Sequence, residues 1–234
     1  MKRKTSALTL IFALLCFLAL LTGSTQSAKA ITIYRDGTIS GTDKIQRDGN
    51  VYTVTGNIFG TIRIDRNNIV LDGGGYTLEG NEIENGVGIT LMTGRNLVTI
   101  RNFHVKGFRS GIELRGSKNR LVNCTLTDCY MGIHLDNAID NTVSDNFLLN
   151  NRMGIKLDSS SDNVFRNNRL DNSTLSNDEE SWFNSIDSSN TLNGKPIIYL
   201  VNEKDLVISP TVYPQVGYLA LVKCTGITVK PIPF

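Results

Sequence analysis

Short apolar segments recur along most of the chain, and none of them is long enough for an amphipathic helix. Between residues 141 and 158 they are Val143, Phe147 with Leu148, and Ile155 with Leu157. Asn, Asp, Gly or Ser residues separate one apolar segment from the next. Apolar segments of this length, bounded by turn-forming residues, predict short β-strands that are joined by tight corners.

The pattern returns about every 22 residues. The tetrapeptide Gly-Ile-x-Leu begins at Gly88, Gly111, Gly132 and Gly154, with spacings of 23, 21 and 22 residues. Asparagine keeps the same period at Asn96, Asn119, Asn141 and Asn163, and Asn68 and Asn190 extend the series, each displaced by an insertion. A fixed period of this length indicates a repeat architecture.

Three strands per period predict an all-β fold, a right-handed parallel β-helix solenoid whose coils of about 22 residues stack roughly 4.8 Å apart. A leucine-rich repeat has a similar length but requires a longer leucine consensus. We expect one corner column to contain Asn102, Cys124, Asn146 and Asn168, because stacked amides can form ladders. We expect the four glycines at another corner, which requires positive φ or close approach of two backbones.

The first 30 residues have the pattern of a secretory signal peptide. Basic residues 2–4 precede the apolar run 8–21, and Ala28-Lys29-Ala30 resembles a cleavage site. An uncleaved membrane anchor is the alternative. Cleavage after Ala30 leaves 204 of the 234 residues, with 20 basic and 22 acidic side chains. This balance argues against nucleic-acid binding, which favours a basic stripe.

No later apolar run is long enough to span a bilayer, so we expect a secreted, periplasmic or cell-surface protein without a transmembrane span after signal cleavage. Residues 31–67 are the predicted N-terminal cap and first coil, and residues 68–194 are the repeats. We expect a loop insertion at 173–185. Residues 195–234 are predicted C-terminal coils, which end either as a fragment or against a partner.

Several segments resemble the NosD-like β-helix family. They are Asn-Thr-Val-Ser-Asp-Asn at 141–146 followed by Gly-Ile-Lys-Leu at 154–157, Val-Leu-Asp-Gly-Gly-Gly-Tyr-Thr-Leu at 70–78, Asn-Gly-Lys-Pro-Ile-Ile-Tyr-Leu-Val-Asn at 193–202, and Tyr-Leu-Ala-Leu-Val-Lys-Cys at 218–224. The resemblance implies an exported right-handed β-helix. In the namesake of the family it also implies copper delivery to a metalloenzyme partner, nitrous-oxide reductase. Pectate lyases and other carbohydrate-active β-helices share the repeat.

The third residue of each Gly-Ile-x-Leu copy is expected to point outward, because neighbouring strand residues alternate between the two faces. We therefore expect an exposed column of Thr90, Glu113, His134 and Lys156. With the next outward positions it forms a surface that we name the charged patch: Glu113, Arg115, His134, Asp136, Lys156 and Asp158. His134 could act there as a general acid or base, or the patch could be a solvated face with weak ion pairs.

A second hypothesis concerns copper, which prefers soft ligands. Cys129, Met131 and His134 lie close in sequence, and Met153 lies one coil beyond Met131. Core packing is the alternative role for the two methionines. Strand geometry separates Cys124 from Cys129 by roughly 16 Å, which is beyond disulfide reach. We expect both thiols to be buried.

The expected insertion holds Trp182, the only tryptophan, and the acidic triplet 178–180. The tryptophan could stack on a sugar and the acids could hold a cation, whereas a disordered polar loop is the alternative. Asn172 begins a glycosylation sequon.

The function predicted first is a non-catalytic surface or periplasmic binding module for a cell-surface glycan or protein. Copper handling for a metalloenzyme is the second hypothesis, and a polysaccharide lyase or hydrolase is the third. The sequence contains neither a tight Asp-Asp pair nor a Gly-His-Gly motif, which argues against the third hypothesis. No catalytic residue and no certain cofactor follow from the residues alone.

Overall fold

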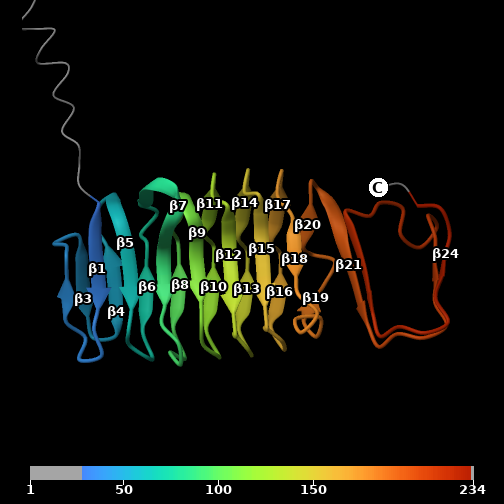
Figure 1. Cartoon of the computed structure of the whole chain (residues 1–234), viewed down its shortest axis with the longest axis horizontal. Helices are drawn as coiled ribbons and strands as arrows, with labels where there is room; N and C mark the ends of the chain where they lie inside the picture. The colour runs from blue at the N-terminus through green and yellow to red at the C-terminus, as the bar shows by residue number, and fades with distance from the viewer. Residues whose placement is uncertain (1–27, 233–234) are drawn as a thin grey trace, which may run out of the picture.

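The computed structural model describes residues 28–232, without the side chains of 81–85. Residues 1–27, which hold most of the expected signal peptide, lie outside this range. The described residues form 24 β-strands and no helix. Figure 1 shows the strands stacked along the long axis, with β1 near one end and β24 at the other. The prediction of a parallel β-helix of about 22-residue coils is confirmed.

Three faces run along the solenoid. Face A contains β3 (Ile45–Asp48), β4 (Val51–Val54), β6 (Val70–Asp72), β8 (Thr99–Arg101), β10 (Arg120–Val122), β13 (Thr142–Ser144), β16 (Val164–Arg166) and β19 (Ser185–Ile186). Face B contains β11 (Thr125–Thr127), β14 (Phe147–Leu149), β17 (Arg169–Asp171) and β20 (Thr191–Leu192). Face C contains β12 (Met131–Asp136), β15 (Met153–Asp158) and β18 (Leu175–Asn177).

Longer strands belong to both faces B and C. They are β5 (Ile58–Ile64), β7 (Thr77–Leu91) and β9 (His104–Leu114). Strand β9 shows the bend, since one end pairs with β11 on face B and the other with β12 on face C. At the N-terminal end, β1 (Lys29–Ile33) pairs with β5 in parallel and with β2 (Ile39–Ser40) in antiparallel orientation. The expected cleavage point after Ala30 falls inside β1.

The C-terminal end departs from the regular coil. Strand β21 (Lys195–Val201) turns back and pairs antiparallel with β20, and β23 (Tyr218–Val222) then pairs with β21 in parallel. The last pair is β22 (Val207–Ile208) with β24 (Thr228–Val229). Within residues 28–232, no helix is both long and apolar enough to cross a membrane.

Columns of apolar side chains fill the core. Leu126, Leu148 and Leu170 occupy one register and are fully buried, as the repeat predicts. The Ile and Leu of successive Gly-Ile-x-Leu copies likewise stack, and each is at most 3% exposed. Apolar burial of this kind stabilises by roughly 25 cal/mol per Å² removed from water. Each coil therefore depends on its neighbours for its core.

Buried asparagines connect the coils through their side chains. In the first column, Asn141 Nδ2 donates to Asn163 Oδ1, and Asn163 Nδ2 donates to Asn184 Oδ1, both at 3.0 Å. In the second column, Asn146 donates to Asn168 at 2.9 Å and Asn168 to Asn190 at 2.8 Å. Each acceptor oxygen also receives the backbone N–H of the residue one coil earlier. The columns thus satisfy donors that water cannot reach.

Parts of the expected asparagine series were wrong. Asn190 belongs to the second column, and Asn184 takes the place beyond Asn163. Asn96 accepts from the backbone of Ser117, not from the first column, and Asn102 contacts Asn123 where we expected Cys124. Asn68 is also outside the first column, because Val70 pairs with Thr99. A period of 22 or 23 residues does not fix register to a single residue.

Residues 173–185 follow the coil path over most of their length. Strand β18 pairs with β15, and Ser181 Oγ accepts the backbone N–H of Ser160 at 2.9 Å. Ser173 and Asn184 similarly receive donors from the preceding coil. The spacing from Asn163 to Asn184 is 21 residues, so this stretch contains an ordinary coil. The expected insertion resulted from aligning Asn190 with Asn163.

The glycine column forms because two backbones approach each other closely. A Cβ on Gly132 would lie 2.7 Å from the carbonyl oxygen of Gly154 and 2.9 Å from Leu148 Cδ2. A Cβ on Gly88 would likewise lie 2.6 Å from the carbonyl oxygen of Gly111, and one on Gly111 would lie 2.7 Å from that of Gly132. None of these glycines has positive φ. Lack of space for a side chain, and not backbone conformation, therefore requires glycine here.

We predict that Gly132→Ala lowers the melting temperature by about 4 °C or more, because the added methyl overpacks the corner. Gly56→Ala is the matched control, since its nearest neighbour would be Lys44 Cδ at an ordinary 3.6 Å. Thermal unfolding followed by circular dichroism measures both. Equal melting temperatures for the two variants would contradict the close approach.

Candidate functional site

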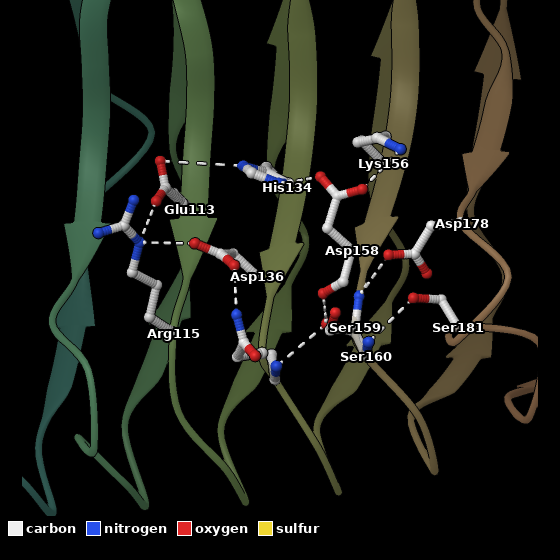
Figure 2. Close-up of polar contacts among 12 residues, drawn as sticks. Glu113, Arg115, His134, Asp136, Lys156, Asp158, Ser159, Ser160, Asp178 and Ser181 are labelled. Carbon is white, nitrogen blue, oxygen red and sulfur yellow. Dashed lines mark hydrogen bonds and ion pairs between the residues drawn. The ribbon is translucent and has the colours of Figure 1, made fainter.

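The charged patch lies on face C, where three coils present outward side chains side by side. Glu113 of β9 pairs in register with His134 of β12, and His134 pairs with Lys156 of β15. Asp136 and Asp158 form the adjoining column. Figure 2 shows these side chains pointing toward one another across the strands. The register of the predicted column is therefore confirmed, and His134 and Lys156 alternate with buried Ile and Leu neighbours.

Ion pairs link the patch from coil to coil. His134 Nε2 lies 2.9 Å from Asp158 Oδ2, and its Nδ1 lies 3.9 Å from Glu113 Oε2. Lys156 Nζ contacts Asp158 Oδ1 at 2.6 Å. Arg115 Nε contacts Glu113 and lies 3.2 Å from Asp136 Oδ2. Each cation of the patch thus has at least one carboxylate partner.

The patch is less exposed than expected. The side chain of Glu113 is only 5% exposed and that of His134 13%, because neighbouring coils cover them. The prediction of an exposed column was wrong, because Glu113 is buried and Thr90, His134 and Lys156 are half-buried. Glu113 Oε1, Arg115 Nε and His134 Nδ1 are buried without a hydrogen bond of good geometry. Attraction between opposite charges therefore compensates for burial at this end of the patch.

Burial and charge act in opposite directions on the two inner groups. Burial raises the pKa of the Glu113 carboxyl, but His134 and Arg115 outweigh it and hold that pKa below its ordinary 4.5. Burial lowers the pKa of the His134 imidazole, but Glu113 and Asp158 outweigh it and raise that pKa above its ordinary 6.5. Both shifts therefore favour the charged forms, a carboxylate next to an imidazolium, more than water does.

The sequence interpretation missed an extension of the patch onto the next coil. Asp178 follows β18 and accepts the backbone N–H of Ser159 at 2.8 Å. Ser159 Oγ also donates to Glu180 at 2.8 Å. Asn177 pairs with Leu157, so the next residues, Asp178 and Asp158, occupy equivalent positions on the two coils. Asp178 therefore continues the column of Asp136 and Asp158 (Figure 2). The correct coil register would have revealed it.

The proposed soft metal ligands lie in different surroundings. Cys129 is 3% exposed, and burial raises the pKa of its thiol to about 11, so it stays protonated at neutral pH. Met131 and Met153 are half-buried and pair in register on neighbouring coils. His134 is held by carboxylates. Among the side chains that the structure describes between residues 28 and 232, those of 81–85 excluded, no group of three His, Cys, Asp or Glu residues is placed to hold a metal ion. Cys129 does not fit a copper site.

Cys124 and Cys129 instead occupy corner positions that hold an asparagine on the following coil. The backbone N–H of Cys124 donates to Asn146 Oδ1 at 2.9 Å, and that of Cys129 donates to Asn151 Oδ1 at 3.0 Å. Both thiols are free and buried, as expected. Each cysteine thus stands where the next coil has a ladder asparagine, which gives it a structural place in the fold.

Trp182 is separate from the charged patch. It is half-buried, packs against the core, and its carbonyl oxygen accepts the hydroxyl of Tyr199 at 2.7 Å. A cavity of about 230 Å³ adjoins it, lined by Glu179, Trp182, Phe183, Leu221, Val222 and Lys223. The segment around Trp182 is therefore tied to β21 and does not extend as a free polar loop.

We predict that His134 stabilises the fold more at pH 6 than at pH 9. A raised folded pKa gives stability that is fully present below the unfolded value of 6.5 and is lost as pH rises through the folded value. The melting temperature of wild type should exceed that of His134→Gln by about 2 °C more at pH 6 than at pH 9.

The exposed His104 supplies the control, because His104→Gln removes the second of the two histidines from another part of the surface. Differential scanning calorimetry across this pH range measures all three proteins. A gap between wild type and His134→Gln that does not change with pH would contradict the ion-paired arrangement.

The comparisons with known proteins agree with this architecture. Residues 21–199 match the family model described as periplasmic copper-binding protein (NosD). No curated protein and no solved structure matches the chain. The matched range spans more than half of the chain and includes the whole charged patch. The chain therefore belongs to the NosD family of periplasmic copper-binding proteins.

Proposed function

We propose that this protein is an exported, non-catalytic binding module whose flat strand faces engage a cell-surface or periplasmic glycan or protein. The observation that supports this function is the register of outward side chains over successive coils. A surface with identical spacing from coil to coil matches a ligand that also repeats. The family description supports a periplasmic location.

The contacts of His134 favour binding over proton transfer. Glu113 and Asp158 face its two ring nitrogens, and its raised pKa favours the imidazolium, which presents charge and N–H groups but no free basic nitrogen. A general base near neutral pH needs an unprotonated nitrogen within reach of the substrate proton. The ion pairs also hold the long side chains of Arg115 and Lys156 in place, which reduces the entropy lost when a ligand binds.

We predict that a panel of soluble polysaccharides and periplasmic extracts contains a ligand that the protein retains without altering it. Isothermal titration calorimetry measures binding to each polysaccharide, and co-purification identifies a protein ligand. Reducing ends and unsaturated products are measured in the same samples. New reducing ends or unsaturated products would contradict this function and support a lyase or hydrolase. Failure of every polysaccharide and every protein to bind would also contradict it.

Copper handling is the second candidate, because the family description names copper. The residues that remain for Cu(I) are Met131 and Met153, whose positions pair directly on β12 and β15, together with His134. Thioethers and imidazole are ligands that Cu(I) accepts. In this candidate the copper ion is cargo for a metalloenzyme partner.

We predict that, if copper is cargo, one equivalent of Cu(I) binds in chelator competition and that Met131→Leu with Met153→Leu weakens binding by about tenfold or more. His134→Ala reports the contribution of the imidazole. Met92→Leu is the matched control, since it removes a half-buried thioether elsewhere in the described residues. Absence of Cu(I) binding, or equal loss in the control, would contradict this candidate.

A further inference from the structure

A column of two arginines and a tyrosine runs along the corner that precedes face C. Ser110, Met131 and Met153 pair in register, so Arg109, Tyr130 and Arg152 stand directly before them on three consecutive coils. The backbone confirms the stacking, because Tyr130 N–H donates to Phe108 at 3.0 Å and Arg152 N–H donates to Cys129 at 3.2 Å. We name these three residues the Arg-Tyr-Arg column.

Tyr130 lies at the centre of the column, between the two exposed arginines. Arg152 Cζ lies 5.1 Å from the centre of the Tyr130 ring, which is a cation–π distance. Arg109 and Arg152 are exposed, whereas Tyr130 is half-buried. Coil spacing places the two arginine positions roughly 10 Å apart, on either side of the ring.

Neither arginine has a carboxylate partner among the residues that the structure describes. Every ion pair found among the side chains that the structure describes, which exclude those of 81–85, involves other cations. The charged patch on the adjoining strands is the opposite case, since its cations are paired. These two guanidinium groups, which have no carboxylate partner among the described side chains, therefore form the part of this surface that favours an anionic ligand.

We propose that the Arg-Tyr-Arg column binds an acidic glycan, with one carboxylated sugar at each arginine, and that Tyr130 positions Arg152 through the cation–π contact. Guanidinium groups bind carboxylates through two parallel hydrogen bonds, so two of them in line favour an acidic sugar chain over a neutral one. A separation of roughly 10 Å is about the length of a disaccharide, so two acidic groups on one chain can meet both arginines. The half-buried Met131 and Met153 give the column an apolar border.

This inference rests on the proposed binding function and specifies its ligand class. Asp128 is the carboxylate in the same corner as Tyr130, and it is exposed. The negative charge of Asp128, two residues before Tyr130, opposes the binding of an anionic ligand at this corner. Replacing it therefore gives a variant whose expected effect has the opposite sign from that of the arginine variants.

The test is calorimetric titration of the purified protein with hexagalacturonate, and with the same oligosaccharide after reduction of its carboxyl groups. We expect the acidic form alone to bind. Arg109→Gln and Arg152→Gln should each weaken binding by about fivefold or more, because each removes a charge-assisted hydrogen-bonding group. Asp128→Asn should tighten binding. Circular dichroism establishes that every variant is folded.

Arg120→Gln is the matched control, because Arg120 is exposed on face A and also lies outside the ion pairs of the described residues. Its effect should stay below about twofold. Equal weakening by Arg120→Gln would show diffuse charge attraction and overturn the site. Absence of hexagalacturonate binding overturns the inference, whereas binding of neutral glycans or proteins by the same preparation would leave the proposed function standing.

Discussion

The need to satisfy buried backbone N–H groups at each corner governs this structure. A coil of about 22 residues turns sharply three times, and each corner leaves donors that the strand ladders do not use. Asparagine oxygens from the following coil accept them, while the amide nitrogens reach carbonyls of the preceding coil, as Asn168 does with Val143. An unsatisfied buried donor costs roughly 1–3 kcal/mol, so one misplaced coil would lose several such bonds at once. The ladders therefore fix register more strictly than interchangeable Leu and Ile side chains can.

Fixed register is what turns the outer surface into columns. Because the backbones of Gly132 and Gly154 stack closely, the strands pair in one register. This register places His134 between Glu113 and Lys156. The same stacking brings Asp158 against His134 although 24 residues separate them in sequence. Surface chemistry in this fold is therefore set by residues one period apart. The charged patch and the Arg-Tyr-Arg column both follow from this rule. The cations of the patch have carboxylate partners, whereas the two arginines of the column have none among the described side chains.

The sequence predicted the fold, the close backbone approach at the repeated glycines and the register of the charged patch, because these depend on repetition alone. It did not predict the burial of Glu113, since that depends on how neighbouring side chains fold over it. It also misaligned Asn190 and so produced a false insertion, because two asparagine columns exist and a spacing near 22 residues fits either. The Arg-Tyr-Arg column was missed for a related reason. Its members differ in residue type, and only the three-dimensional register shows that they stand together.

The directional asparagine ladders have a consequence for how such a chain can change its length. Each coil offers the same acceptors to the coil before it and requires the same acceptors from the coil after it, as Asn141, Asn163 and Asn184 do in turn. Removing or duplicating one complete period joins equivalent ends and leaves every remaining ladder bond in place, because stability in such stacks is close to a sum over neighbouring pairs. A deletion of any other length breaks all columns together. Gene duplication and unequal recombination therefore have one tolerated step size in this molecule, and it is the single coil.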